Sequence, residues 1–119
     1  MTRSITIGEH EVLMTANGAT PYRFKNLFKE DIFAIMLGQA DEKDGGEIMD
    51  MSGKLAYIMA MQAEGADMNK LTEESFYSWL EQFDAMDVAQ AGEEIYMLYV
   101  DQTQQLSTAK KKQLTQNGK

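Results

Sequence analysis

Apolar and polar residues alternate at the start of the chain. Apolar residues recur at spacing two on either side of a polar stretch over 8–11, which is the pattern of a β-hairpin with one buried face. We therefore predict a hairpin over residues 4–15. An isolated hairpin is marginally stable in water, so its apolar face should pack on the elements that follow. The residues of that face are Ile5, Ile7, Val12 and Met14.

The apolar residues change to a helical period after the hairpin. Pro21, directly after Thr20, suits the first turn of a helix. Thr72, which lies between Leu71 and Phe76, is the clearest helix cap in the chain. This pattern predicts a mainly α fold with a small N-terminal β-hairpin (α+β), in which about four helices pack around one core. The expected helices span about 21–37, 47–64, 72–83 and 87–106.

Two of these helices allow alternatives at their ends. Asp31 would cap a second, shorter helix if the charged cluster around it divides the first one. Either Asp84 or Asp87 would cap the last helix. The sequence leaves both choices open.

Two segments lack a helical pattern. Residues 39–46 are polar and end in a Gly-Gly pair, so we expect a flexible loop there. From 107 onward the chain is polar and contains a basic run, which predicts a flexible basic tail over 107–119. A single domain over 1–106 therefore accounts for the rest.

Length and charge narrow the classes of function. A chain of 119 residues that is 44% apolar suffices for one packed core. The net charge of −8 would repel phosphate backbones, so we expect no nucleic-acid binding. Cysteine is absent, which excludes thiolate chemistry. Because no stretch is apolar enough for a signal peptide or a membrane span, we expect a cytoplasmic protein that does not enter the membrane.

The sequence offers no set of residues typical of an active site. The single histidine, His10, lies at the predicted hairpin turn beside two glutamates, where we expect it to be solvated. The segment 41–46 begins like a calcium loop, but Lys43, Gly45 and Ser52 stand where that loop needs ligands. We therefore expect no catalysis, no metal and no cofactor.

Methionine is unusually frequent, with ten residues in the chain. Methionine fills irregular cores, and it also forms surfaces that accept varied partners. Met51, Met59 and Met61 are therefore either core residues or a face that binds a helical segment of another protein. Tyr96 and Tyr99 either cover the core or stand at an interface between subunits. These five residues are the candidate protein-binding site.

The order of elements resembles that of the tail assembly chaperones of long-tailed (siphovirus-type) bacteriophages and prophages of Gram-positive bacteria. The resemblance covers nearly the whole chain. It is carried by residues 19–24 (ATPYRF), 55–60 (LAYIMA), 76–83 (FYSWLEQF) and 94–99 (EIYMLY).

This resemblance implies a non-catalytic protein that binds the tape measure protein, keeps it soluble and helps to recruit the tail tube protein. Such proteins act in the host cytoplasm and are absent from the mature virion. The resemblance also implies self-association, for which the last helix and the hairpin edge are the surfaces to consider.

In this family a ribosomal frameshift often produces a longer product that engages the tube protein. Lys110, Lys111 and Lys112 are compatible with an A-rich slippery codon run, and they are equally compatible with a solubilising tail. The acidic composition also permits an alternative of another class, in which a phage-encoded inhibitor mimics DNA to block a basic host protein.

Overall fold

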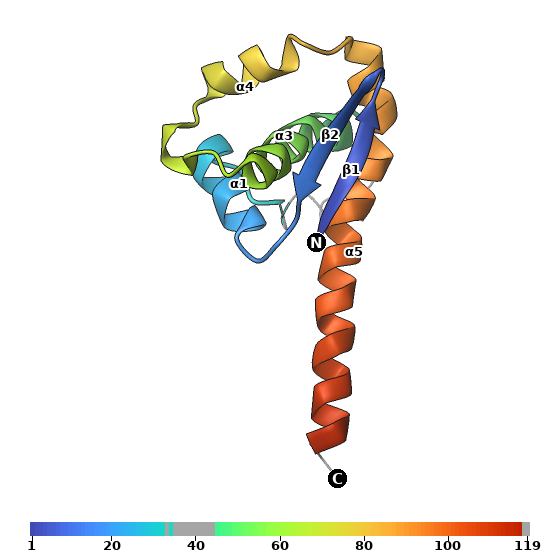
Figure 1. Ribbon diagram of the computed structural model, residues 1–119. Coiled ribbons are helices and arrows are strands. Elements are labelled where there is room, and N and C mark those ends of the chain that lie inside the picture. Colours follow the sequence, from blue (N-terminus) through green and yellow to red (C-terminus); the bar gives the residue numbers. More distant parts are fainter. Residues whose placement is uncertain (33, 35–44, 118–119) are drawn as a thin grey trace.

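The structure is a computed structural model that describes residues 1–32, 34 and 45–117, with side chains described over 1–32, 34 and 51–101. It confirms the α+β fold class, with an N-terminal hairpin followed by helices (Figure 1). In chain order the elements are β1 (Thr2–Ile7), β2 (His10–Thr15), α1 (Thr20–Phe28), α3 (Gly45–Glu64), the short 3₁₀ helix η2 (Met68–Lys70), α4 (Glu73–Leu80) and α5 (Ala85–Asn117).

The two strands form the predicted antiparallel hairpin. Ile7 pairs with His10 across a two-residue turn at Gly8 and Glu9, and the ladder continues to Thr2 opposite Thr15. The hairpin therefore starts two residues before the predicted position. Its predicted inner face is also correct, because Ile5, Ile7 and Met14 are buried and Val12 is partly buried.

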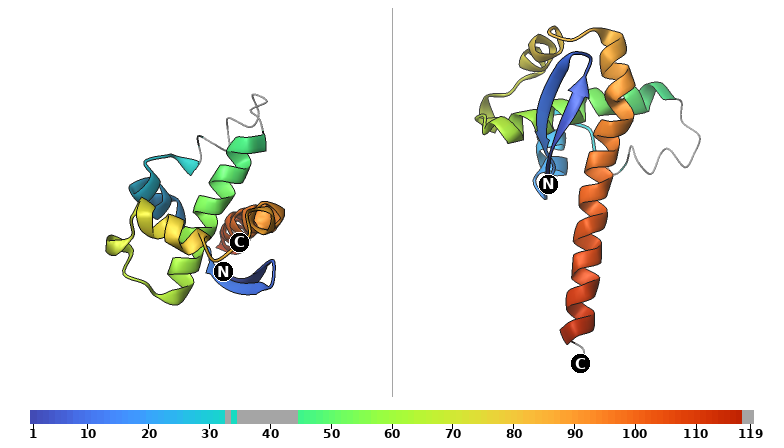
Figure 2. Two further views of the ribbon diagram at one scale, coloured as in Figure 1. Left: turned by 90° about the horizontal axis from the view of Figure 1, so that it is seen from above. Right: turned by 45° about the vertical axis from the view of Figure 1, so that its right-hand side comes forward.

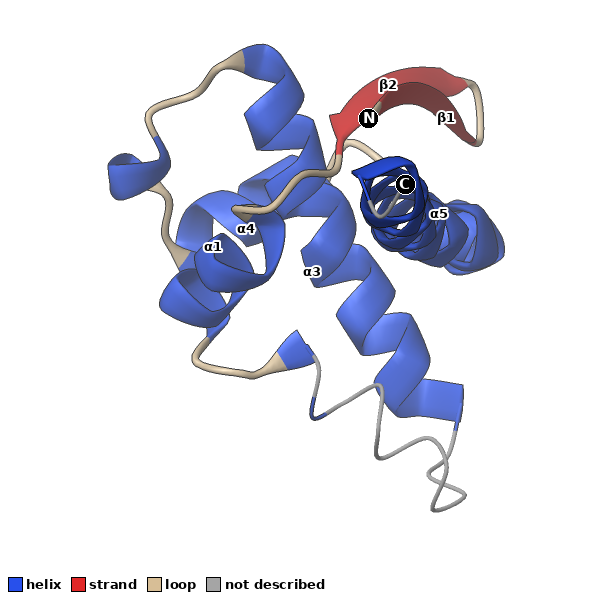
Figure 3. Ribbon diagram, turned by 90° about the horizontal axis from the view of Figure 1, so that it is seen from below, coloured by secondary structure: helices blue, strands red, loops and turns tan. Residues whose placement is uncertain are grey.

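Helix α3 is the centre of the molecule. The hairpin and α5 pack on it from one side, while α1 and α4 lie on the other (Figures 2 and 3). The reason is its composition: residues 55–61 are seven consecutive apolar side chains, so the helix has no polar face there and must be covered all round. Every residue from Leu55 to Met61 is buried.

Helix α1 ends earlier than the expected boundary at residue 37. Lys29 adopts the left-handed conformation with φ 60°, and its backbone N–H donates to Lys25 O in a helix C-cap. Ile32 and Ala34 are again helical. The single helix over 21–37 is thus wrong, and the division near Asp31 is the alternative that the structure supports. Residues 35–37 and the predicted loop over 39–44 lie outside the described residues, while Gly45 and Gly46 begin α3.

Side-chain caps begin the next two helices. Thr72 accepts a hydrogen bond from the Ser75 backbone N–H, and Ser75 Oγ accepts one from the Thr72 backbone N–H, which completes a capping box for α4. Asp84, rather than Asp87, precedes α5 and accepts from the Met86 backbone N–H through Oδ1 at 2.9 Å. Helix α4 ends at Leu80, three residues before the predicted end.

Helix α5 continues to Asn117 and extends well beyond the globular body (Figure 1). The predicted helix end at 106, and with it the flexible tail from 107, is therefore wrong as far as residue 117. The segment 101–117 contains no glycine or proline and is rich in Gln and Lys, which are good helix formers. None of the helices over the described residues combines the length and apolarity needed to cross a bilayer.

Gly8 supplies the first test of this fold. Its φ of +62° favours glycine, and a Cβ there would lie 2.3 Å from Asp87 Oδ2 at the start of α5. We expect Gly8→Ala to lower the free energy of unfolding by about 1–3 kcal/mol, measured by chemical denaturation. Gly18→Ala is the matched control, since nothing described lies within 4 Å of that position. It should change the free energy by less than about 0.5 kcal/mol. Equal effects of the two substitutions would contradict the packing of the turn on α5.

Candidate protein-binding site

The methionines expected to grip a partner lie in the core. Met51, Met59 and Met61 are 1%, 0% and 8% exposed and belong to one buried apolar cluster. The interpretation of these residues as a binding face is therefore corrected, because the helix that carries them is covered on all sides. The alternative interpretation, in which these methionines fill the core, is the one that the structure supports.

The two tyrosines of α5 differ in their surroundings. Tyr99 is buried in the core, and this burial raises the pKa of its phenol, with a further increase from the negative charge of Asp31. Tyr96 is partly buried against the same cluster. Neither residue presents a free ring to a partner. Lys110, Lys111 and Lys112 fall in the part of α5 beyond the globular body, where only the backbone is described.

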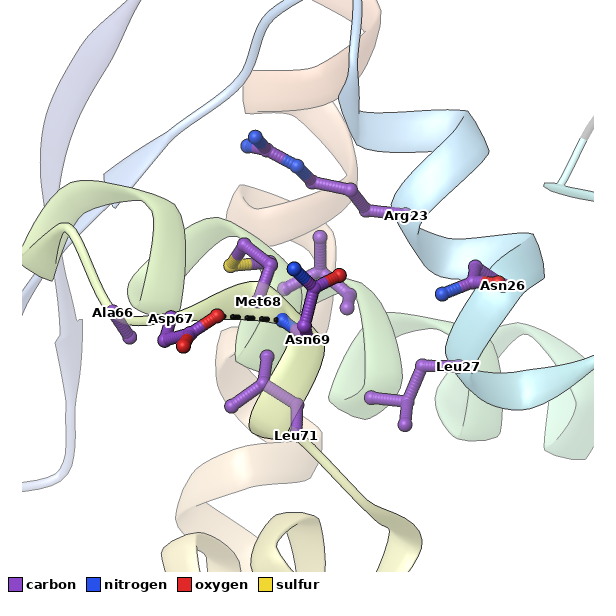
Figure 4. A pocket seen from close by; sticks show the side chains of 9 residues that line it. Arg23, Asn26, Leu27, Ala66, Asp67, Met68, Asn69 and Leu71 are labelled. Atoms are coloured by element: carbon purple, nitrogen blue, oxygen red, sulfur yellow. Dashed lines mark hydrogen bonds between the residues drawn. The ribbon is translucent and has the colours of Figure 1, made fainter.

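A first hollow lies between α1, the end of α3 and η2, with a volume of about 440 Å³ (Figure 4). Its lining is mainly polar and includes Arg23, Asn26, Asp67 and Asn69. The Arg23 guanidinium donates to Gln62 Oε1 at 2.9 Å, and the Asp67 carboxylate accepts from the Asn69 backbone N–H at 3.1 Å. Because it offers little apolar surface, this hollow is the weaker candidate for binding apolar side chains of a partner.

A second hollow of about 420 Å³ lies between β2, the C-terminal part of α3, and α4 with the residues that follow it. We call it the β2–α4 groove. Residues 10–13 of β2 form one side, Ala60 and Ala63 form the floor, and Trp79 and Phe83 form the opposite side. Leu13 is 59% exposed, which makes it one of the large apolar side chains that the fold leaves open to solvent.

Aromatic contacts fix the α4 side of the groove. The rings of Trp79 and Phe83 meet edge to face with centroids 5.0 Å apart. The ring centroid of Tyr57 of α3 lies 5.5 Å from that of Trp79. At the top of the groove, His10 contacts Phe83 edge to face at 5.2 Å. Below this contact the floor carries only two alanines, the smallest apolar side chains with a Cβ, which leave the groove open.

A hydrogen bond anchors the same side of the groove to the core. The Tyr57 hydroxyl and Ser75 Oγ lie 2.7 Å apart, and Ser75 also closes the capping box of α4. The start of α4 is thus tied to α3 through a buried side chain. The α4 side of the groove is therefore fixed to the core by ring contacts and by this hydrogen bond.

The charge of the groove is negative. Glu11 and Glu64 line it, and the described lining contains no lysine or arginine. Over the residues whose side chains are described, no group of three histidines and carboxylates is arranged to hold a metal ion. The arrangement can bind apolar side chains and favours basic groups at its rim.

Trp79 and Phe83 entered the sequence analysis only within the segment 76–83, and Leu13 was not singled out. In the structure both rings pack against the core and also line the groove. The sequence does indicate the direction of Leu13. It alternates with Val12 and Met14 of the inner face, so its side chain points to the outer face of the hairpin.

The structure is thus a small α+β fold with an apolar groove lined by two glutamates. Comparisons with protein-family models, with curated proteins and with solved structures found no match to this chain.

Proposed function

We propose that this chain is a non-catalytic phage tail assembly chaperone that holds segments of the tape measure protein in the β2–α4 groove. The observation that carries the proposal is the groove itself, in which Trp79, Phe83 and the exposed Leu13 offer apolar surface beside an open alanine floor. The resemblance in residues 19–24, 55–60, 76–83 and 94–99 supplies the identity of the client.

The size of the groove suits reversible holding. A hollow of about 420 Å³ accommodates a few apolar side chains, and burying each contributes on the order of 1.5–3 kcal/mol before the cost of association. Such binding is weak enough for the client to be passed on to the growing tail. The net charge of −8 favours the solubility of the loaded complexes.

The other parts of the proposed role are taken from the resemblance to tail assembly chaperones. In this proposal the protein acts in the host cytoplasm, helps to recruit the tail tube protein, self-associates and is left out of the virion. The helical extension of α5 beyond the body is available for such contacts, because it lies away from the hairpin and the groove (Figure 1).

Co-expression with the tape measure protein of the same phage tests the proposal. We expect the chain to keep that protein in the soluble fraction and to co-purify with it. Leu13→Lys should reduce the retained amount by about tenfold, since it replaces an exposed apolar side chain at the β2 edge of the groove with a charge and disturbs no buried contact.

Tyr22→Ser is the matched control for that experiment. Tyr22 is 75% exposed on α1, outside both hollows, so the variant should retain the client as the native chain does. Failure of the native chain to co-purify with the tape measure protein would overturn the proposed function. Equal losses in both variants would overturn the assignment of the groove.

A further inference from the structure

We infer that the β2–α4 groove takes its occupant as an extended strand, added antiparallel to the free edge of β2, with apolar and basic residues in alternation. The inference rests on the proposed function only in treating this groove as the surface that binds a protein chain. It adds the conformation and the chemistry of the bound segment.

The pairing of the hairpin shows which backbone groups of β2 point outward. Met1 and Ala16 exchange both backbone hydrogen bonds at 2.8 Å. Hydrogen-bonded and non-bonded pairs alternate along an antiparallel ladder. By the observed register, Met14 and Val12 therefore bond to β1, whereas Leu13 and Glu11 direct their N–H and C=O groups away from it.

The next outward-pointing residue of β2, Thr15, is already hydrogen-bonded to a side chain of α3. The carbonyl oxygen of Thr15 accepts a hydrogen bond from Gln62 Nε2 at 2.6 Å, as expected for a group that points away from β1. The backbone groups of Glu11 and Leu13 have no partner among the described residues. The same two residues line the groove. The open part of the strand edge and the apolar hollow are thus one continuous surface.

The position of a third strand follows from sheet geometry. It would run about 4.8 Å from β2, above the floor formed by Ala60 and Ala63. Its side chains would point alternately to the two faces of the sheet. Those on the inner face, the face of Val12 and Met14, would enter the hollow between the alanines and the rings of Trp79 and Phe83.

Two glutamates at the groove favour basic residues on the outer face of the added strand. Side chains on the outer face would lie beside Glu11, and Glu64 stands at the rim of the groove. Both carboxylates favour lysine or arginine in the occupant. An acidic segment would meet like charges on both sides. The occupant is therefore an extended segment with apolar residues facing inward and basic residues facing outward, a mode of binding known as β-strand addition.

A synthetic seven-residue peptide of alternating Lys and Val provides the probe. Trp79 is the only tryptophan of the chain and lies in the groove, so its fluorescence reports binding directly. We expect a saturable change in its emission as the capped peptide Lys-Val-Lys-Val-Lys-Val-Lys is added to the full chain. Absence of a saturable change would overturn the inference.

Backbone N-methylation distinguishes strand addition from charge attraction or a helical mode of binding. In an antiparallel pair, residues that bond to each other lie opposite each other on the same face of the sheet. The peptide residues bonded to Glu11 and Leu13 therefore lie on the outer face and are lysines. Methylating the lysine amides should weaken binding by at least about tenfold. Methylating the valine amides gives a peptide of the same charge that keeps the hydrogen bonds to β2, so its affinity should change little.

The two methylated peptides thus control for each other. The reverse order of affinities would overturn the antiparallel orientation, because the valine amides are the bonded ones in a parallel third strand. Equal affinities, whether both are retained or both are lost, would overturn the inference. If the peptides fail while the tape measure protein still co-purifies with the chain, strand addition is wrong and the proposed function stands.

Discussion

Replacing Met59 with alanine should lower the free energy of unfolding by about 2–5 kcal/mol, measured by chemical denaturation. Met59 is fully buried in the middle of α3, the helix that contacts β2, α1, α4 and α5. Removing its thioether chain leaves a cavity that the surrounding helices cannot fill without moving. The loss would be a large part of the stability of a domain of this size.

Met59→Leu is the matched control for that variant, because it conserves volume and apolarity. It should cost less than about 1.5 kcal/mol and leave client retention unchanged. A stable leucine variant that no longer retains the client would contradict the assignment of this methionine to the core. That outcome would restore the methionine face of α3 as a binding surface.

Phe76→Ala should release α4 from the body while much of the core stays folded. Helix α4 has eight residues, and Phe76 is its one buried side chain. The ring packs against those of Phe28 and Tyr57, with centroids 5.0 and 5.4 Å away. Losing it removes about 3–5 kcal/mol of packing from a short helix that has few other anchors. We expect amide hydrogen exchange in 73–80 to accelerate far more than in α3.

Tyr77→Ala controls for the helix propensity of α4, since Tyr77 is a neighbouring aromatic residue that is 60% exposed. It should change exchange in α4 little and lower the free energy of unfolding by less than about 1 kcal/mol. Equal acceleration in the two variants would contradict the role of Phe76 as the anchor. Because α4 carries Trp79, Phe76→Ala should also abolish the fluorescence response to the groove peptide.

The hairpin and the helix caps could be predicted because their signals are local. Alternation in the first fifteen residues identified the inner face, and Thr72 identified the start of α4, since a capping side chain bonds within its own turn. The division after α1 depends on the left-handed backbone of Lys29, a lysine for which sequence gives little warning. The length of α5 was underestimated because low apolarity was taken as a sign of disorder, although its residues are good helix formers.

The site was harder to predict, because it depends on which faces the tertiary structure leaves open. Met59 and Met61 look the same in sequence whether their helix is central or at the surface, and only the packing of the hairpin and α5 around α3 decides. The groove, in turn, joins Leu13, Ala60 and Trp79, which are far apart in the chain. No local pattern links these three residues.

Amide hydrogen exchange of the chain, alone and in complex with a tape measure fragment, tests most directly whether protein chains bind in the β2–α4 groove. We expect slower exchange in the complex at the outward amides of Glu11 and Leu13 and in 79–83, with 67–71 of the other hollow unchanged. Protection confined to 67–71 or to α5, with Glu11 and Leu13 exchanging as in the free chain, would contradict it.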